Sequence, residues 1–430
     1  MNSEGQTDEL TAAVTLPGQK KMNIIFIVAD DVGYEVPTVD GGQSYSTPTL
    51  DKMAREGLQF TQCYSSPLCS PSRTALVTGK YNFRNYFTWG SLPVTEKTFA
   101  NMLANKGYKT CVAGKWQFDG GDASLKAFGY QNYCIWDPLK ASGAEDIHLG
   151  SFYKNPKVFQ NGAFLPDSVT NGKYGEDMYC QYVKDFIDSN KTKPFFVYYP
   201  MVLCHGPYWP TPDDAAYTSF VPDSTYSDTV WYPSMVKYMD KKINEIINKV
   251  VADGLANNTL IVFTGDNGTP QQIFSMYRGK LIQGGKSKTT AWGTHVPLIA
   301  YGPAKLSKGV VKDLVSFVDF LPTFADVANI PKPTTYGTLD GVSFFNQLTG
   351  RATTPRDWIY NYYNANPDEE PANTAIWVQD TTYKLYNGKK TSFYNVKKDV
   401  YERTPIESSN LTPQEQRTRT EFQGVIDSIH

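Results

Sequence analysis

Two short segments of the chain place carboxylate or amide side chains close behind an apolar run. Asp30 and Asp31 follow the run NIIFIV. Asp266 and Asn267 follow the run TLIVFT. Three carboxylates and an amide oxygen form a hard, all-oxygen ligand set that suits Ca²⁺ or Mg²⁺ and not zinc. Each pair alone is also what a turn or a helix cap uses, but two such pairs behind two matching runs favour a metal site.

The segment CSPSRTALVTG, residues 69–79, is the most specific pattern in the chain. It combines Cys69, Pro71 and Arg73 with a Thr-Gly pair after four further residues. A buried free thiol is the usual fate of a lone cysteine, and the fixed neighbours of Cys69 argue against it here. The pattern matches the signature C-x-P-x-R-x4-T-G of type I sulfatases, so the chain resembles this family of the alkaline phosphatase superfamily.

Further stretches that resemble the family's motifs extend over most of the chain. They are Asn23–Gly33, Gly107–Trp116, Pro194–Pro207, Thr264–Gly268, Gly285–Pro297 and Ser316–Thr323. The last of these is expected to be a structural element. The resemblance implies the α/β fold of the family and a sulfatase activity.

In this family the motif cysteine is oxidised to Cα-formylglycine, so the resemblance implies that a formylglycine-generating maturation enzyme converts Cys69. A thiol would be a poor catalyst, because a sulfated thiol has no easy exit. The hydrated aldehyde offers one hydroxyl to attack sulfur, and deprotonation of the second hydroxyl expels sulfate and restores the aldehyde. This is covalent catalysis with a built-in release step.

The resemblance also assigns a cation to the acidic pairs. The ion, Ca²⁺ or alternatively Mg²⁺, would be held by residue 69 together with Asp30, Asp31, Asp266 and Asn267. Such an ion offsets charge on the sulfuryl oxygens and lowers the basicity of the attacking hydroxyl.

Four basic side chains receive roles because their positions match the family's motifs. One would hold the formylglycine hydrate, two the sulfate, and one would act on the leaving alcohol. Arg73 would hold the formylglycine hydrate through a forked contact. Lys115 and Lys286 resemble the pair that clamps sulfate oxygens. Lys288 is the alternative to Lys286, and any one of these lysines could instead be a solvated surface residue. His205 would protonate the leaving alcohol, a task suited to a group that titrates near neutrality, although a lone histidine can also be a core residue.

One position departs from the family's pattern. Where the family reads G-K-W-H, this chain reads GKWQ, with Gln117 in the place of the histidine. That histidine contacts the formylglycine hydroxyl and assists its deprotonation, whereas an amide takes no proton at neutral pH. Sulfate release could be slower or use water or another base, or Gln117 could recognise the substrate.

Loops around the expected pocket supply candidates for substrate binding. Arg84 and Asn85 follow the signature segment, and Tyr208 and Trp209 follow His205. Aromatic faces that pack on sugar rings, with Arg and Asn on hydroxyls or further sulfates, predict a sulfated polysaccharide or oligosaccharide as substrate. The chain has 29 Tyr, 23 Phe and 8 Trp, but most aromatic residues of a protein lie in its core.

Alternating strand and helix patterns must position these groups. Apolar runs predict strands at Asn23–Val28, Leu58–Tyr64, Tyr108–Ala113, Phe195–Tyr199 and Thr259–Thr264. Helical periodicity predicts helices at Leu50–Gly57, Glu96–Gly107, Asp177–Ser189 and Ser234–Ala256. This alternation is typical of a large, mainly parallel mixed sheet sandwiched by helices, with ligand sites beyond the carboxyl ends of its strands.

The pattern changes after Gly350. Short alternating strands are predicted at Ala375–Val378, Lys384–Asn387 and Ser392–Asn395, and a helix over about Pro413–Ser428. We expect a catalytic α/β domain over residues 21–355 and a C-terminal subdomain of antiparallel sheet plus helix over residues 356–430. Residues 1–20 are polar and are expected to be a disordered leader or remnant.

Composition narrows the class of protein. The 430 residues carry a formal net charge of −2, which gives no basic field for nucleic acid. No apolar run approaches the roughly 20 residues of a membrane span. Four histidines disfavour a zinc site, and six cysteines are too few for a disulfide scaffold. Compact saccharide sulfatases resemble bacterial exported enzymes, so we expect a periplasmic or secreted protein.

Three functions fit these observations. The first is a sulfatase, a sulfuric ester hydrolase that acts on saccharide sulfate esters. The second is a phosphonate or phosphodiester hydrolase of the same superfamily. The third is an inactive relative that binds sulfated glycans and has lost turnover with the change at Gln117. Release of sulfate or phosphate from aryl esters separates the first two, and an unconverted Cys69 without activity would favour the third.

Overall fold

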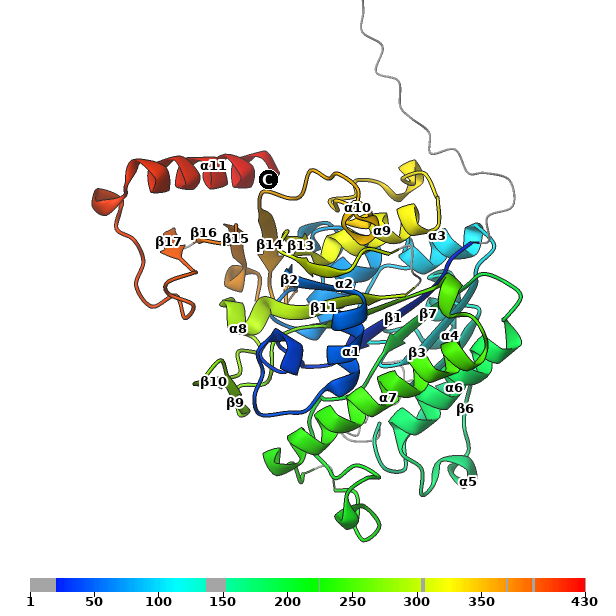
Figure 1. Ribbon diagram of the computed structural model, residues 1–430. Helices are drawn as coiled ribbons and strands as arrows, with labels where there is room; N and C mark the ends of the chain where they lie inside the picture. Colours follow the sequence, from blue (N-terminus) through cyan, green and yellow to red (C-terminus); the bar gives the residue numbers. More distant parts are fainter. Residues whose placement is uncertain are drawn as a thin grey trace, which may run out of the picture.

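The computed structural model describes residues 21–136, 152–223, 225–302, 306–368, 370–388 and 391–429. The expected leader, residues 1–20, lies outside these ranges. Within them the chain builds one large mixed sheet with helices on both faces, and a separate antiparallel sheet with a long helix near the C-terminus (Figure 1). This architecture confirms the predicted fold class.

The large sheet has parallel strands at its centre. In order across it, the strands are β12 (Gly309–Val311), β2 (Leu58–Tyr64), β11 (His295–Tyr301), β8 (Thr259–Gly265), β1 (Asn23–Ala29), β7 (Phe195–Pro200), β3 (Lys109–Gly114), β4 (Asn132–Trp136), β5 (Val158–Gln160) and β6 (Ala163–Phe164); β13 (Val315–Ser316) also pairs with β2. Strands β8, β1, β7, β3 and β4 are parallel neighbours, whereas β11 is antiparallel to both β2 and β8.

Helices cover both faces of this sheet because its central strands are apolar on both sides. In β1, Ile24 and Phe26 belong to one hydrophobic cluster, and the alternate residues Ile25 and Ile27 belong to the other. Full burial of each such side chain contributes about 2 kcal/mol. The first cluster is covered by α2 (Cys69–Thr78), α3 (Phe99–Asn105), α4 (Gly121–Ala127) and α9 (Phe320–Val327), and the second by α1 (Pro48–Glu56), α6 (Gly175–Ser189) and α7 (Tyr232–Ala252).

The helix predicted at Glu96–Gly107 begins later than its periodicity predicts. It is α3, whose first residue Phe99 follows the cap residue Thr98. The hydroxyl of Thr98 accepts hydrogen bonds from the N–H groups of Ala100 and Asn101, and the Asn101 side chain accepts one from the N–H of Thr98. This reciprocal cap satisfies backbone donors that the start of a helix leaves free.

Shorter elements fill the remaining described ranges. They are the helices α5 (Asp167–Thr170), α8 (Ala291–Thr294) and α10 (Phe345–Thr349) and the hairpin of β9 (Phe274–Tyr277) and β10 (Lys280–Gln283). Among the described helices, none is long and apolar enough to cross a membrane.

The C-terminal sheet is an antiparallel meander. Its strands are β14 (Ile359–Tyr363), β15 (Ala375–Gln379), β16 (Tyr383–Asn387) and β17 (Ser392–Asn395), and α11 (Pro413–Ile429) packs beside β15 and β16. The last three strands and the helix agree with the prediction. Strand β14 was missed, because its sequence IYNYY has no alternation of apolar and polar residues. The division of the chain near residue 355 stays a prediction.

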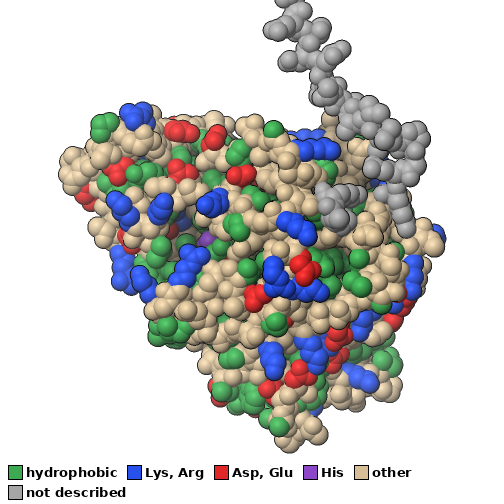
Figure 2. Space-filling model, viewed as in Figure 1, with side chains coloured by type: hydrophobic (Ala, Val, Ile, Leu, Met, Phe, Trp, Pro, Cys, Tyr) green, Lys and Arg blue, Asp and Glu red, His purple; other side chains and the backbone are tan. Residues whose placement is uncertain are grey.

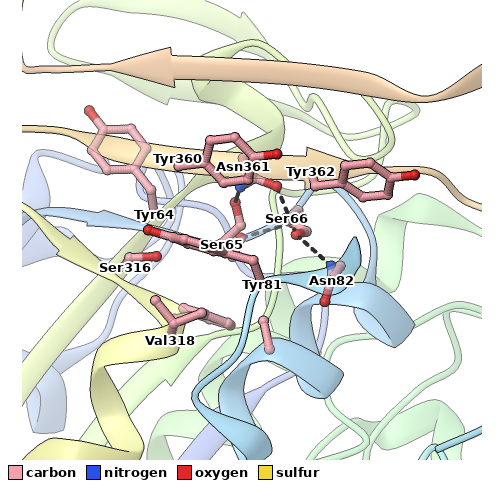
Figure 3. A pocket seen from close by; sticks show the side chains of 12 residues that line it. Tyr64, Ser65, Ser66, Tyr81, Asn82, Ser316, Val318, Tyr360, Asn361 and Tyr362 are labelled. Atoms are coloured by element: carbon pink, nitrogen blue, oxygen red, sulfur yellow. Dashed lines mark hydrogen bonds between the residues drawn. The ribbon is translucent and has the colours of Figure 1, made fainter. Parts of the chain in front are cut away.

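Strand β14 fastens the C-terminal sheet to the loop that precedes α2 (Figure 3). The amide nitrogen of Asn361 donates to the Ser65 carbonyl at 3.1 Å, and the Ser66 hydroxyl donates to Asn361 Oδ1 at 3.2 Å. The Ser66 carbonyl in turn accepts a hydrogen bond from Ser72 in α2 at 2.9 Å. The C-terminal sheet therefore helps to fix the start of α2, where Cys69 lies.

Candidate active site

Strands β1 and β8 bring the two acidic segments together. They are parallel neighbours with Ala29 opposite Gly265 at their ends, so Asp30 and Asp266 leave the sheet side by side at its carboxyl edge. The N–H of Asp266 donates to the Ala29 carbonyl at 3.0 Å, and the N–H of Asp31 donates to Asp266 Oδ1 at 3.0 Å. The register of two strands thus determines the spacing of the carboxylates.

The four predicted metal ligands, Asp30, Asp31, Asp266 and Asn267, are all buried. The amide nitrogen of Asn267 donates to Asp31 Oδ1 at 2.7 Å. Within the described part of the chain, Asp30 Oδ1 and Asn267 Oδ1 have no hydrogen-bond partner. A buried polar atom without a partner costs about 1–3 kcal/mol. Carboxylate and amide oxygens left open in this way fit a hard cation such as Ca²⁺.

Each carboxylate of the cluster also contacts a basic side chain. Lys115 Nζ lies 2.6 Å from Asp30 Oδ2, and Lys286 Nζ lies 2.7 Å from Asp31 Oδ2. The Arg73 guanidinium donates from Nε and Nη2 to Asp266 Oδ2 at 3.0 and 2.9 Å, and from Nη1 to the Lys115 carbonyl at 3.0 Å. The structure therefore brings together the predicted Arg73, Lys115 and Lys286.

The ion pairs control the charges of these groups. Burial alone would raise the pKa of Asp30, but Lys115, His205 and Arg73 bring it well below its usual value. Burial and the negative charge of Asp30 raise the pKa of Asp266 despite Arg73. Burial lowers the pKa of the Lys286 ammonium, and Asp31 more than restores it. Crowded carboxylates of this kind favour a bound cation.

The alternative Lys288 is exposed, whereas Lys286 reaches the cluster. The segment that carries both is tied to the site on two sides. The N–H of Lys286 donates to the Thr269 carbonyl at 2.9 Å, close behind Asn267, and the N–H of Ser287 donates to the Pro67 carbonyl at 2.9 Å, close before Cys69. The geometry thus favours Lys286 as the second clamp lysine.

Cys69 is the first residue of α2 and is 3% exposed. Its thiol is close enough to the cluster for its charge to be coupled to both clamp lysines and to Asp30 and Asp266. Burial raises the pKa of the thiol despite the two lysines. As an unmodified side chain, Cys69 is therefore a neutral thiol at pH 7 and not a nucleophilic thiolate.

The loop after β7 carries His205 to the same edge of the sheet. Strand β7 is the parallel neighbour of β1 on the side opposite β8. His205 Nε2 lies 3.9 Å from Asp31 Oδ2, and Nδ1 lies 2.5 Å from the Gly206 carbonyl. A proton on Nδ1 suits that carbonyl and leaves Nε2 facing the cluster. Burial, Lys115 and Lys286 lower the pKa of His205 to about 4.

Two buried side chains that the sequence did not single out hold this loop. The Tyr153 hydroxyl donates to the His205 carbonyl at 2.5 Å and to the Val202 carbonyl at 3.1 Å. Glu176 accepts from the Val202 N–H at 3.1 Å and from the Tyr199 hydroxyl. Their distance in sequence from the loop left no local pattern that could have identified them.

Gln117 is 7% exposed and adopts a φ of 76°. Its Oε1 has no hydrogen-bond partner among the described residues. At Gly114 the end of β3 passes so close to the end of β7 that an added Cβ would lie 2.0 Å from the Pro200 carbonyl oxygen. The N–H of Lys115 donates to that same oxygen at 2.7 Å, so Gly114 lets β3 deliver Lys115 beside the end of β7.

The four loop residues that were predicted to bind substrate make contacts within the protein. Arg84 binds Asp340 through two nitrogens at 2.9 Å, and Asn85 is buried and donates to Thr78 Oγ1 at 3.0 Å. The Tyr208 hydroxyl accepts from Gln272 at 3.2 Å, and Trp209 donates to the Tyr226 carbonyl at 2.7 Å. Tyr208 and Trp209 are buried. Their roles toward a substrate stay predictions.

Basic side chains gather on one part of the surface. The chain as a whole carries −2. In the view of Figure 2, Lys and Arg side chains gather on the left of the molecule around a hollow in which a histidine is visible. A hollow surrounded by basic groups raises the local concentration of anions.

The chain is similar to known families along most of its length. The family model described as sulfatase matches residues 22–330, and the model described as N-sulphoglucosamine sulphohydrolase, C-terminal, matches residues 286–423. Arylsulfatase A of Bos taurus is 30% identical over 411 residues, which cover 88% of this chain and 77% of that protein.

Two further proteins are similar to this chain over almost its whole length. The N-acetylgalactosamine-6-O-sulfatase of Bacteroides thetaiotaomicron is 26% identical, covering 95% of this chain and 93% of that protein. A protein solved in complex with its substrate D-glucosamine-2-N,6-O-disulfate gives a TM-score of 0.74 over 95% of this chain and 97% of its own, at 19% identity. The second likeness is evidence of a shared fold.

Proposed function

Because this chain belongs to the sulfatase family, we propose that it is a sulfuric ester hydrolase that removes sulfate from a sulfated carbohydrate. One observation carries the proposal: Lys115 and Lys286 both reach the buried carboxylates beside residue 69. Two ammonium groups directed at one small site can hold the oxygens of a sulfate group and stabilise charge that shifts during its transfer.

We propose that the acidic cluster holds Ca²⁺, with Mg²⁺ as the alternative. The ligands would be Asp30, Asp31, Asp266 and Asn267, and the open oxygens of Asp30 and Asn267 support this. When bound, the ion would offset charge on the sulfuryl oxygens and lower the basicity of the attacking hydroxyl. Arg73 orients Asp266 through two hydrogen bonds to Oδ2, and the other oxygen, Oδ1, accepts a hydrogen bond from the N–H of Asp31 within the cluster.

At residue 69 we propose Cα-formylglycine, made from the cysteine by a maturation enzyme. The neutral state of the buried thiol supports this, because a neutral thiol is a weak nucleophile. The hydrated aldehyde would supply a hydroxyl nucleophile and, through its second hydroxyl, a route for sulfate release. Lys115 and Arg73 lie close enough to this position to be coupled to its charge, and they would hold its oxygens in place.

His205 is the proposed general acid for the leaving alcohol. Its Nε2 faces the cluster, while Nδ1 is occupied by the Gly206 carbonyl. The pKa of about 4 belongs to the substrate-free site, where two lysines oppose protonation. A bound sulfate group neutralises those lysines and raises the pKa of the imidazole toward the working pH.

Gln117 replaces a side chain that could take a proton, which bears on the alternative of an inactive sulfated-glycan binder. Its buried Oε1 is open to a hydrogen bond. We propose that Gln117 binds the substrate or the hydroxyls of residue 69 and that water or another base accepts the proton during release. Turnover by the matured protein distinguishes the enzyme from the inactive binder.

The carbohydrate assignment draws on what the relatives' names state. One relative is named for N-acetylgalactosamine 6-sulfate, and a similar structure contains a disulfated glucosamine. We propose a saccharide sulfate ester as the substrate class and a periplasmic or secreted location for the enzyme. Fractionation of the native cells, with detection of the protein in each fraction, tests the location.

The decisive experiment measures the release of 4-nitrophenol from 4-nitrophenyl sulfate, 4-nitrophenyl phosphate and 4-nitrophenyl phenylphosphonate. The protein is produced together with a formylglycine-generating enzyme, and mass spectrometry reports whether the peptide with residue 69 carries an aldehyde. We expect sulfate release that is lost in Cys69→Ala. Faster cleavage of phosphate or phosphonate esters would favour the phosphonate or phosphodiester hydrolase, and an aldehyde-bearing protein without turnover would favour the glycan binder.

A further inference from the structure

The hairpin of β9 and β10 presents apolar side chains to solvent. Phe274 is 55% exposed, Met276 is 37% exposed and Leu281 is 63% exposed. Met276 lies opposite Leu281, and Phe274 is two residues from Met276 along β9, so all three share one face of the hairpin. Ser275 and Ile282 belong to the other face and are buried. A sheet face in water normally carries polar residues, and a group of exposed apolar side chains marks a surface that binds a partner.

The outer edge of β9 is already paired. The N–H of Gln43 donates to the Met276 carbonyl at 2.8 Å, and the N–H of Met276 donates to the Ser44 hydroxyl at 2.7 Å. The N–H of Arg278 donates to the Gly41 carbonyl at 3.1 Å. These bonds hold the hairpin in place and satisfy its edge, so a partner would bind to the apolar face and not add a strand.

The charge around this face is strongly one-sided. No Asp or Glu occurs between Asp266 and Asp313, whereas Arg278 and Lys280 belong to this stretch and are exposed at the turn of the hairpin. The Arg278 guanidinium lies over the Tyr277 ring at 5.0 Å. In Figure 2 a hydrophobic patch lies at the lower left, where Figure 1 places β9 and β10, and Lys and Arg side chains gather above it. The partner is therefore expected to be anionic.

A lipid surface with anionic headgroups fits both properties of the hairpin. Apolar side chains can enter the boundary between headgroups and acyl chains, while basic side chains stay among the headgroups. A second copy of the chain would bring two basic turns together, which like-charge repulsion opposes. A sulfated glycan would bind the basic groups and leave the apolar face in water.

From these observations we propose that the β9–β10 hairpin docks the protein on a membrane surface that contains anionic lipids. Phe274, Met276 and Leu281 enter the boundary of the acyl region, and Arg278 and Lys280 contact the headgroups. The protein lies on the surface and does not span the bilayer. Docking requires no turnover, so it is a property separate from the proposed hydrolysis.

The base of the hairpin is joined to the segment that carries Lys286. The Gln271 side chain donates to the Lys286 carbonyl at 2.9 Å and to Ser287 Oγ at 3.0 Å, and the Gln283 side chain donates to the Gln271 carbonyl at 2.9 Å. Docking through the hairpin therefore places the segment of this proposed clamp lysine close to the membrane surface.

The test measures how the whole protein sediments with vesicles. One set contains phosphatidylcholine alone, and the other contains two parts phosphatidylcholine to one part phosphatidylglycerol. We expect binding to the mixed vesicles that weakens as salt is added, and little binding to the neutral ones. Phe274→Ser combined with Leu281→Ser should weaken binding about 10-fold. Lys280→Gln should weaken it about 5-fold.

Val251→Ser and Lys106→Gln are the matched controls. Val251 on α7 is 55% exposed, as Phe274 is, and Lys106 is exposed at the end of α3. Both controls should bind the mixed vesicles as the unaltered protein does, and the thermal midpoint of each variant reports whether it is folded.

Absence of binding to the mixed vesicles would overturn the proposal, as would equal losses in the controls and the hairpin variants. Dimerisation that Leu281→Ser abolishes, without vesicle binding, would assign the face to a second copy of the chain instead. Failure of the matured protein to hydrolyse 4-nitrophenyl sulfate would refute the proposed function and leave the vesicle result standing.

Discussion

Replacing Tyr153 by Phe tests how the position of His205 governs catalysis. The Tyr153 ring is fully buried, and its hydroxyl donates to the carbonyls of His205 at 2.5 Å and Val202 at 3.1 Å. The Val202 carbonyl also accepts from the His205 N–H at 3.1 Å. Removal of the hydroxyl therefore leaves mainly the His205 carbonyl unpaired, at a cost of about 1–3 kcal/mol.

The loop can recover that cost only by moving, and His205 moves with it. A general acid contributes about 10²–10⁴-fold to a rate, and a displacement of about 1 Å can remove about 100-fold. For a sulfated monosaccharide, whose alcohol must be protonated as it leaves, we expect kcat to fall about 10- to 100-fold. For 4-nitrophenyl sulfate, whose phenolate leaves without a proton, we expect a fall of less than about 3-fold.

The assay measures kcat for both substrates in Tyr153→Phe, His205→Ala and Tyr174→Phe. Tyr174 is the matched control because its ring is buried and stacks on Tyr153 at 5.6 Å, while its hydroxyl has no hydrogen-bond partner among the described residues. His205→Ala should show the same selective loss as Tyr153→Phe, and a larger one. Equal losses with both substrates would refute the reasoning, since they would indicate general damage to the site.

Three further predictions concern the cation, a buried acid and the C-terminal sheet. Ca²⁺ should raise the thermal midpoint of the unaltered protein and not that of Asn267→Ala; an equal rise in both would contradict the proposed ligand set. Burial raises the pKa of Glu176 to about 7 from 4.5, so its contribution to stability is full below about pH 4.5 and is lost as the pH rises through about 7. The free energy of unfolding in urea should fall by at most about 3 kcal/mol over this pH range for the unaltered protein, and Glu176→Gln should lack that fall. The same pH dependence in both proteins would refute the assignment. Lys384 and Glu402 form a buried ion pair at 3.0 Å. Lys384→Met breaks it and should cost about 3–5 kcal/mol of unfolding free energy, of which Glu402→Gln should restore a part; a double variant with purely additive losses would show that the pair does not interact.

The sequence predicted the site residues whose positions depend on the end of a strand or on one helical turn. Asp30 and Asp266 each follow an apolar run, and parallel strands deliver their carboxyl ends to one edge, so their proximity could be predicted. The fixed spacing of Cys69 and Arg73 within one helical turn was similarly local. Such features depend on residues that are neighbours along the chain or on one sheet edge.

Features that depend on distant partners could not be predicted. The antiparallel strand β11 lies between β2 and β8, and its apolar run does not reveal its direction. The guanidinium of Arg84 binds Asp340, 256 positions away, and the sequence did not predict this ion pair. Tyr153 supports the site through hydrogen bonds to the carbonyls of His205 and Val202, and a carbonyl acceptor leaves no trace in a sequence.

The burial of α2 has a consequence for the order of events during synthesis. Every residue of that helix is buried, and Asn361 secures the loop before it although Asn361 lies 295 positions after Ser66. If Cys69 is converted as proposed, the modifying enzyme must reach it while the chain is still open. Because Ser66 is synthesised long before Asn361, the loop before Cys69 stays unsecured during that time. A chain that folds before modification would keep its thiol permanently. The final proportion of active enzyme would therefore depend on the relative rates of modification and folding.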